Sequence, residues 1–276
     1  MDVIDIVKVI LFGVVEGITE WLPISSTGHM ILLNEFVTLN VSKEFFNIFL
    51  VVIQLGAILA VIVIFWKKIF PFQFKEKNKP VIEKDILTMW FKIIVACIPA
   101  AIVGVGFDDE LDALFYNYQT VSISLIVFGI AFIIIEERNK GTLPRINSLS
   151  DITYKTAAII GLFQLISAIF PGTSRSGATI LGALLIGVSR TIAAEFTFFL
   201  AIPVMFGASL LKIVKGGLNF TQTEFLMLVL AMLVAFIVSM LVIKLLMNYI
   251  KKHDFKVFGW YRIILGIIVL GYFAFL

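Results

Sequence analysis

The chain has 276 residues, of which 60% are hydrophobic and 15% are charged, and its mean hydropathy is +1.05. A soluble domain of this length does not need so much apolar surface, and several runs reach the roughly 18–20 apolar residues that cross a bilayer. The net charge of +3 comes from basic residues spread over several short loops, which argues against a nucleic-acid partner and fits cytoplasmic loops of a membrane protein.

The N-terminus and the cysteine content narrow the class further. The first residues, MDVIDIVK, lack a positively charged region and a small-residue cleavage site, so they are not expected to be a removable signal peptide. Cys97 is the only cysteine and lies in an apolar run, so neither a disulfide nor a thiolate metal site is expected. The sequence therefore predicts an all-α polytopic membrane protein.

Residues 4–38 are expected to form a helical hairpin that does not cross the membrane. Two apolar arms flank a polar centre that contains Pro23. Each arm of roughly 12–16 residues falls short of the ~30 Å hydrocarbon core. A polar break is tolerated at membrane depth where protein or a wet cavity covers it. This pattern favours a re-entrant hairpin over the alternative, an interfacial amphipathic helix followed by a loop.

Two carboxylates stand near the end of the first arm. Glu16 and Glu20 are four residues apart, so they project from one helix face. Because facing carboxylates repel, a divalent cation held between them and a diphosphate would relieve the repulsion, and hard oxygen ligands suit Mg²⁺ or Ca²⁺. The alternative is that one glutamate is protonated and the other pairs with Arg175 of the second hairpin.

A cluster of hydroxyl groups follows the bend. Ser25, Ser26 and Thr27 occupy positions where helix N-caps belong, and capping accounts for at least one of them. His29 lies three residues beyond Ser26, within reach of the same face. A lone histidine in a membrane is often a packing residue, but beside hydroxyls and carboxylates it is a candidate for acid–base chemistry.

Six further segments are long and apolar enough to span a membrane, and they lie at about 45–66, 86–107, 114–135, 192–214, 225–247 and 257–276. Gln54 is a polar residue inside the first of them. It either lines a cavity or bridges helices.

Residues 155–190 predict a second hairpin of the same kind, with the tip FPGTSRSGAT at 170–179. Gly172 and Gly177 allow the backbone to approach a ligand closely. The hydroxyl donors of the tip are Thr173, Ser174, Ser176 and Thr179. Arg175 and the helix N-terminus that follows it favour an anion, so the tip predicts a phosphate site. The alternative is a helix cap whose arginine pairs with a carboxylate.

The two hairpins belong to an internal repeat. In the hairpins, Gly13, Ile18, Pro23, Ser26 and Leu33 recur in order as Gly161, Ile166, Pro171, Ser174 and Leu181. In the spans that follow, Glu44, Phe45, Gly56 and Ala57 recur as Glu195, Phe196, Gly207 and Ala208. Each copy is one hairpin plus three spans, and three is odd, so the second copy is expected to be inverted relative to the first.

The expected boundaries are about 1–135 for the first repeat, 136–154 for a cytoplasmic linker and 155–276 for the second repeat. Lysine and arginine concentrate in loops 67–85, 136–156 and 248–256, which therefore read as cytoplasmic. Neither residue type occurs in 9–42 or 93–137, which places the first hairpin and a loop at 108–113 outside. The two polar tips should then meet near the membrane midplane.

Metal-binding carboxylates, a hydroxyl group beside a histidine and an anion site at one depth suggest hydrolysis of a phosphate ester or anhydride. The surrounding membrane suggests a substrate with a lipid tail. The competing class is a carrier that moves such a lipid phosphate across the bilayer, because inverted repeats with broken helices also occur in transporters.

Three motifs carry a family resemblance. EGITE at 16–20, SSTGH at 25–29 and PGTSRSGAT at 171–179 resemble the signatures of the bacterial undecaprenyl-pyrophosphate phosphatases, the bacitracin-resistance family. Those signatures are an acidic pair of the form E/Q-x-x-x-E, a histidine shortly after it, and PGxSRSxxT. The resemblance extends over essentially the whole chain, including FLVVIQLGAILAV at 49–61 and a Tyr-Arg pair at 261–262.

The resemblance implies a bacterial plasma-membrane enzyme that removes one phosphate from undecaprenyl pyrophosphate, regenerates the lipid carrier of cell-wall precursors and confers bacitracin resistance. The family's functional residues fall on Glu16, Glu20, Ser26, His29, Ser174, Arg175 and Thr179. The site is expected to open to the extracytoplasmic side. The sequence leaves the oligomeric state open, and a homodimer is among the states it allows.

These inferences define one candidate site. Ser26 is the preferred nucleophile, with His29 or Glu20 as its base. The rival mechanisms are attack by His29, with Ser26 as a positioning donor, or direct attack by water. Arg175 is assigned to catalysis and substrate binding together. The other expected substrate-binding residues are Ser25, Thr27, Gln54, Thr173, Ser174, Ser176, Gly177 and Thr179, and the expected metal ligands are Glu16 and Glu20.

Overall fold

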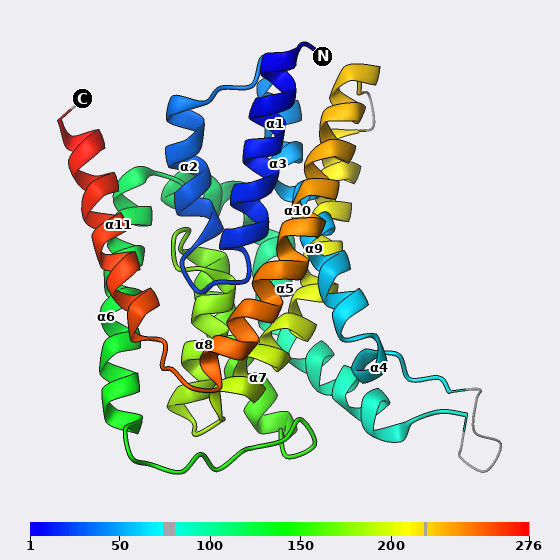
Figure 1. The fold of residues 1–276 in the computed structure, drawn as a ribbon, viewed down its shortest axis with the longest axis vertical. Coiled ribbons are helices and arrows are strands. Elements are labelled where there is room, and N and C mark those ends of the chain that lie inside the picture. Colours follow the sequence, from blue (N-terminus) through cyan, green and yellow to red (C-terminus); the bar gives the residue numbers. More distant parts are fainter. Residues whose placement is uncertain (74–80, 218–219, 276) are drawn as a thin grey trace.

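The computed structural model describes residues 1–73, 81–217 and 220–275, and these residues are helical apart from connections and two isolated bridges (Figure 1). The helices of the first half are α1 (Val3–Thr19), α2 (Ser26–Phe36), α3 (Lys43–Ile64), α4 (Trp66–Ile69), α5 (Lys84–Phe115) and α6 (Tyr118–Asn139). Those of the second half are α7 (Tyr154–Ile169), α8 (Arg175–Leu185), α9 (Arg190–Gly216), α10 (Gln222–Ile250) and α11 (Lys256–Ala274).

Six helices in the described part of the chain are long and apolar enough to cross a membrane, as the sequence predicts. They are α3, the Lys84–Phe107 part of α5, α6, α9, α10 and α11. The prediction of an all-α polytopic membrane protein is therefore confirmed at this level.

Two predicted boundaries are wrong. The expected loop at 108–113 is helical, because α5 bends at Phe107, with φ −139° and ψ 16°, and then continues to Phe115. The sequence DDELDALF supplies acidic residues and good helix formers at the start of this last segment, which favours a new helical turn. Helix α6 also extends beyond residue 135, because Glu136 is buried and held by Arg190 and by the backbone N–H of Phe255.

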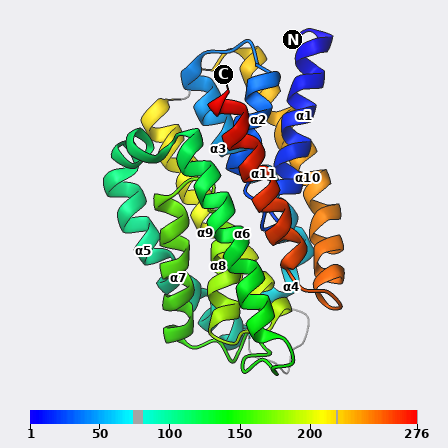
Figure 2. The ribbon, with the colours of Figure 1, turned by 90° about the vertical axis from the view of Figure 1, so that its left-hand side faces the viewer.

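The short helices form two hairpins that approach each other from opposite ends of the molecule. Helices α1 and α2 have 17 and 11 residues, and α7 and α8 have 16 and 11. The α1–α2 hairpin descends from the upper end in Figures 1 and 2, and the α7–α8 hairpin rises from the lower end. Their tips meet inside the molecule, where Ser176 of the second donates a hydrogen bond to the Glu20 carbonyl of the first, at 3.1 Å.

Helix α9 provides the packed support beneath the tips. Its residues 193–201 are all buried. The indole of Trp21, which ends the first arm, is fully buried and stands edge-on to Phe198, with ring centroids 5.2 Å apart. The bend of the first hairpin is therefore anchored on the central helix by an aromatic pair.

Small residues set the spacing of the helices that flank the hairpins. A Cβ on Gly13 would lie 2.7 Å from the Ala231 carbonyl oxygen, so α1 rests directly on the backbone of α10. Gly161 brings α7 closer still to the backbone of α5, where an added Cβ would lie 2.4 Å from the Ala96 carbonyl oxygen. Close backbone approach of this kind is how helices gain van der Waals contact where lipid removes the hydrophobic driving force.

This packing predicts the effect of one methyl group. Gly161→Ala should push α5 and α7 apart, because the added Cβ would overlap the Ala96 backbone, and should destabilise the fold by about 1–3 kcal/mol. Thermal unfolding in detergent measures the change. Gly104→Ala is the matched control, since no atom lies within 4 Å of its added Cβ. An equal melting temperature for both variants would contradict the packing argument.

Candidate active site

Both hairpin tips end in the same local structure, a serine N-cap with an unusual backbone. Ser25 caps α2 with φ 74°, and Ser174 caps α8 with φ 68°. Each Oγ accepts a hydrogen bond from a glycine N–H three residues on, Gly28 at 3.3 Å and Gly177 at 3.1 Å. Positive φ at a serine costs on the order of 1–3 kcal/mol, so tertiary contacts must hold these turns.

The caps correct the alignment of the two tips. The sequence comparison paired Ser26 with Ser174, but the backbone pairs Ser25 with Ser174. The second turn contains one more residue between its proline and its cap, so matching the prolines shifts the register. Ser26 therefore corresponds to Arg175, and each is the first residue of its helix.

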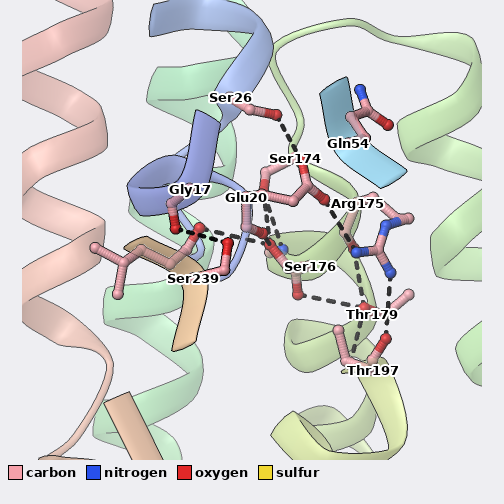
Figure 3. A network of polar contacts seen from close by, with 12 residues as sticks. Gly17, Glu20, Ser26, Gln54, Ser174, Arg175, Ser176, Thr179, Thr197 and Ser239 are labelled. Carbon is pink, nitrogen blue, oxygen red and sulfur yellow. Dashed lines mark hydrogen bonds and ion pairs between the residues drawn. The ribbon is translucent and has the colours of Figure 1, made fainter. Parts of the chain in front are cut away.

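Glu20 lies between these two residues and contacts both (Figure 3). Ser26 Oγ donates a hydrogen bond to Glu20 Oε2 at 2.9 Å. Arg175 Nη2 donates to Glu20 Oε1 at 3.0 Å, and the two side chains are only 12% and 6% exposed. A single carboxylate thus joins the candidate nucleophile of one tip to the cation of the other.

The guanidinium of Arg175 keeps part of its hydrogen-bonding capacity. Its Nη1 donates to the Thr197 carbonyl of α9 at 3.2 Å, while its buried Nε has no partner within the described residues. An arginine held at one edge, with an unpaired donor, is suited to receive an additional oxyanion.

A cavity of about 150 Å³ lies beside this pair. Its polar lining comes from both hairpins and α3, and comprises Glu20, Ser26, Thr27, Gln54, Ser167, Ser174 and Arg175. The other lining residues are Pro171 and Gly172 of the second tip and Val204, Met205 and Ala208 of α9. The cavity therefore combines charged and hydroxyl groups with a hydrocarbon surface.

Several of the predicted binding residues lie behind the cavity wall. Thr179 donates to the Arg175 carbonyl at 2.9 Å and accepts a hydrogen bond from the Thr197 hydroxyl at 2.9 Å. Ser25 acts as a cap, and Ser176 joins the tips through the Glu20 carbonyl. Thr173 is buried without a partner for its hydroxyl in the described structure, and Gly177 faces Arg262. These residues shape the site and do not contact its interior.

Glu16, the other glutamate of the first tip, is deeply buried. It is 1% exposed, and its Oε1 has no partner in the described part of the chain. No group of three or more His, Cys, Asp and Glu side chains suited to a metal ion is found among the described residues. Glu16 and Glu20 fit a hard cation only if further oxygen ligands, such as phosphate oxygens, complete its coordination.

Both ring nitrogens of His29 are engaged by protein groups. Nδ1 lies 2.7 Å from the Ser25 carbonyl oxygen, and Nε2 lies 2.7 Å from the Tyr261 hydroxyl. The imidazole ring of His29 and the phenol ring of Tyr261 are stacked, with an interplanar angle of 6°. In this conformation the histidine supports the cap, and Glu20 is the side chain that accepts the Ser26 hydrogen bond.

Tyr261 and Arg262 are the residues at the site to which sequence reasoning gave no role. Arg262 is fully buried and donates to backbone carbonyls of both tips. Its signal in the sequence is a charge in the middle of an apolar span, which is expensive and therefore rarely without purpose. The residues next to Arg262 in the sequence do not reveal which groups its guanidinium contacts.

Comparisons with known proteins agree over nearly the whole chain. The family model described as "Bacitracin resistance protein BacA" matches residues 9–268. "Undecaprenyl-diphosphatase 1" of Clostridium acetobutylicum is 67% identical over 273 residues, 99% of each chain. "Undecaprenyl-diphosphatase" of Desulfitobacterium hafniense is 65% identical over 274 residues, covering 99% of this chain and 98% of the relative. A protein of the same name from Enterococcus faecalis is 63% identical over 270 residues, 98% of each chain.

Proposed function

The chain belongs to the bacitracin resistance protein BacA family, and we propose that it is an integral membrane phosphatase of the bacterial plasma membrane. It hydrolyses undecaprenyl pyrophosphate to undecaprenyl phosphate and inorganic phosphate, the activity that its relatives' names carry. This recycles the lipid carrier of cell-wall synthesis and confers resistance to bacitracin. The observation that carries the proposal is the contact of Ser26 and Arg175 with one carboxylate, Glu20, at the edge of the cavity.

The diphosphate is bound mainly by the second tip. Arg175 offers its guanidinium and Ser174 a hydroxyl at the cavity, and α8 directs the positive end of its dipole at the same point. The first carbons of the lipid tail lie against Val204, Met205 and Ala208 of α9. One cavity thus accommodates a polar head and the start of an apolar tail.

The chemistry begins with proton transfer from Ser26. Glu20 Oε2, which already accepts the Ser26 hydrogen bond, takes the hydroxyl proton as Oγ attacks the terminal phosphorus. A bond forms from Oγ to phosphorus, and the bond from that phosphorus to the bridging oxygen breaks. The bridging oxygen leaves with undecaprenyl phosphate and takes the proton from Glu20, which is thereby ionised again. Water then attacks the phosphoserine: its oxygen bonds to phosphorus, the bond from phosphorus to Oγ breaks, one water proton passes through Glu20 to Oγ, and inorganic phosphate leaves.

Substrate binding prepares Glu20 for this role. Arg175 Nη2 and Glu20 Oε1 form an ion pair at 3.0 Å. A phosphate oxygen that bonds Arg175 competes with Glu20 for the guanidinium. Substrate binding therefore opens the ion pair and leaves the carboxylate bonded to Ser26.

A divalent cation is part of the proposal. Glu16, whose buried Oε1 is unpartnered in the described structure, and Glu20 would hold Mg²⁺ or Ca²⁺ together with phosphate oxygens. When bound, the cation would neutralise charge on the diphosphate.

The fold of the proposed enzyme is two inverted repeats with re-entrant hairpins. When the two repeats are exchanged, α1 corresponds to α7 and α10 to α5, and α1 packs on α10 just as α7 packs on α5. Helices α6 and α11 correspond to each other, and they also pack together. The described ends of the α3–α5 connection and the α6–α7 and α10–α11 connections lie at the lower end of Figure 1. Most of the basic loop residues belong to these three connections in the sequence. The positive-inside rule assigns this end to the cytoplasm, so the first hairpin enters from outside and the cavity opens to the extracytoplasmic side.

Replacement of the nucleophile tests the chemistry. Ser26→Ala should lower turnover at least about 1,000-fold, because it removes the hydroxyl that donates to Glu20 and attacks phosphorus. Phosphate release measures the rate, and mass spectrometry of quenched wild-type protein should find phosphoserine at position 26. Ser239→Ala is the control, since that buried serine donates to the Gly17 carbonyl within the helix packing. Phosphohistidine at His29, or near-normal turnover of Ser26→Ala, would contradict the assignment.

A release assay separates the enzyme from the carrier and tests the cation. Purified protein in detergent should release phosphate from a polyprenyl diphosphate, lose this activity in EDTA and regain it with Mg²⁺ or Ca²⁺. Glu16→Gln should need more cation for the same recovery, because one charged ligand is lost. A transporter without phosphatase activity releases no phosphate. Release that EDTA leaves unchanged would remove the cation from the mechanism.

Labelling tests the orientation and the entry sides of the hairpins. In a Cys97→Ala background, Asn40→Cys lies in the α2–α3 connection and Lys155→Cys lies at the start of α7, and both positions are exposed. A membrane-impermeant thiol reagent should label position 40 on intact cells and position 155 only after permeabilisation. Labelling of both from one side would contradict opposite entry, and the reversed pattern would contradict the outward-facing site.

A further inference from the structure

Arg262 sits between the two hairpin tips, although it belongs to neither. Its Nη1 donates to the Pro23 carbonyl of the first tip at 3.2 Å. Its Nη2 donates to the Gly172 and Thr173 carbonyls of the second tip, at 3.1 and 2.7 Å. One guanidinium on α11 therefore bonds the backbone of both turns at once.

The seat of this side chain is built around it. A Cβ on Gly177 would lie 2.7 Å from Arg262 Nη1, so glycine at the first turn of α8 leaves room for the guanidinium. The ring of Phe128 on α6 covers the guanidinium carbon from 5.8 Å. Glycine, an aromatic face and three carbonyl oxygens together accommodate a planar fork, which a lysine ammonium does not match.

Burial makes this charge costly. Arg262 is 0% exposed, and among the described residues it forms no ion pair with a carboxylate. It also lies close to the N-terminus of α8, where the helix dipole is itself positive. A buried cation without a counter-charge reduces stability, so its placement beside an anion site favours a functional role.

Arg262 gives the tips a connection that does not depend on the ion pair of Arg175. The ion pair of Arg175 with Glu20 is one of the side-chain links between them, and the bond of Ser176 to the Glu20 carbonyl is another. In the proposed reaction the substrate draws Arg175 away from Glu20. The bonds from Arg262 involve carbonyl groups that no step of that reaction uses, so they persist while the ion pair opens.

We propose that Arg262 is a positioning residue, which holds the two tips in register during turnover and adds positive potential behind the diphosphate. This inference rests on the proposed phosphatase function. Misplacement of the tips by ~1 Å would separate Ser26 on one tip from the phosphate bound by the other, and errors of that size cost about 100-fold in rate.

Two substitutions of Arg262 distinguish the effect of its planar guanidinium geometry from the effect of its positive charge. Arg262→Lys keeps the charge but loses the bidentate geometry, so kcat should fall about 100-fold while inhibition by inorganic pyrophosphate stays near the wild-type level. Arg262→Met removes both, so kcat should fall at least as far and pyrophosphate inhibition should weaken about tenfold. All rates are taken per folded molecule, from the fraction that melts cooperatively in detergent.

Arg190 and Gly177 supply the matched variants. Arg190 pairs with the buried Glu136, outside the cavity lining, so Arg190→Lys should lower the melting temperature but leave kcat per folded molecule unchanged. Gly177→Ala places a Cβ 2.7 Å from Arg262 Nη1 and also 3.2 Å from Ser174 Cβ, and the first and closer contact displaces the guanidinium without removing it, so it should share the kcat loss of Arg262→Lys. It keeps the test decisive if the Arg262 variants do not fold.

The outcomes distinguish this inference from the function on which it rests. If wild-type protein releases phosphate but Arg262→Lys and Gly177→Ala keep its kcat per folded molecule, the positioning role is overturned and the phosphatase stands. If they lose stability alone, Arg262 is structural and the inference is again wrong. If wild-type protein releases no phosphate, the proposed function itself fails.

Discussion

The ion pair of Glu20 with Arg175 is the interaction on which the rest of the structure depends. Two charged side chains, each largely removed from solvent, meet at 3.0 Å inside a protein in which 60% of the residues are hydrophobic. Neither charge could be buried alone without a cost of several kcal/mol. The fold must therefore deliver one carboxylate and one guanidinium to the same point, from opposite ends of the molecule.

Broken helices are the solution to that requirement. A continuous span through this region would satisfy its backbone internally and would leave no helix N-terminus at the interior. Short arms bring two helix starts, at Ser26 and Arg175, to the centre, where free N–H groups become available. The cost appears in the backbone, as positive φ at Ser25 and Ser174, and is offset by packing such as that of Trp21 on Phe198.

Sequence reasoning identified the spans, the hairpins and the polar tips, because each has a local signature. Apolar length marks a span, and the grouping of Glu16, Glu20 and the hydroxyls marks a tip that cannot face lipid. It could not give the register of the caps, since the extra residue in the second turn is visible only in the backbone at Ser174. It also could not show that Glu20, and not His29, contacts Ser26, because that depends on distances between turns. The partners of Arg262 lie 239, 90 and 89 residues away in sequence, beyond any local pattern.

The alignment of the two serine caps also shows which residues of the two tips can be compared with each other. Ser26 and Arg175 occupy equivalent positions, each directly after a positive-φ serine, and both side chains bond to Glu20. Each tip thus places the first residue of a short helix beside Glu20. Serine stands there in one tip and arginine in the other, so the tips are complementary, one offering a hydroxyl and the other a cation. Two serines would leave Glu20 without this cation, and two arginines would bring two cations together. The candidate site therefore depends on a difference between two positions that each follow a positive-φ serine cap.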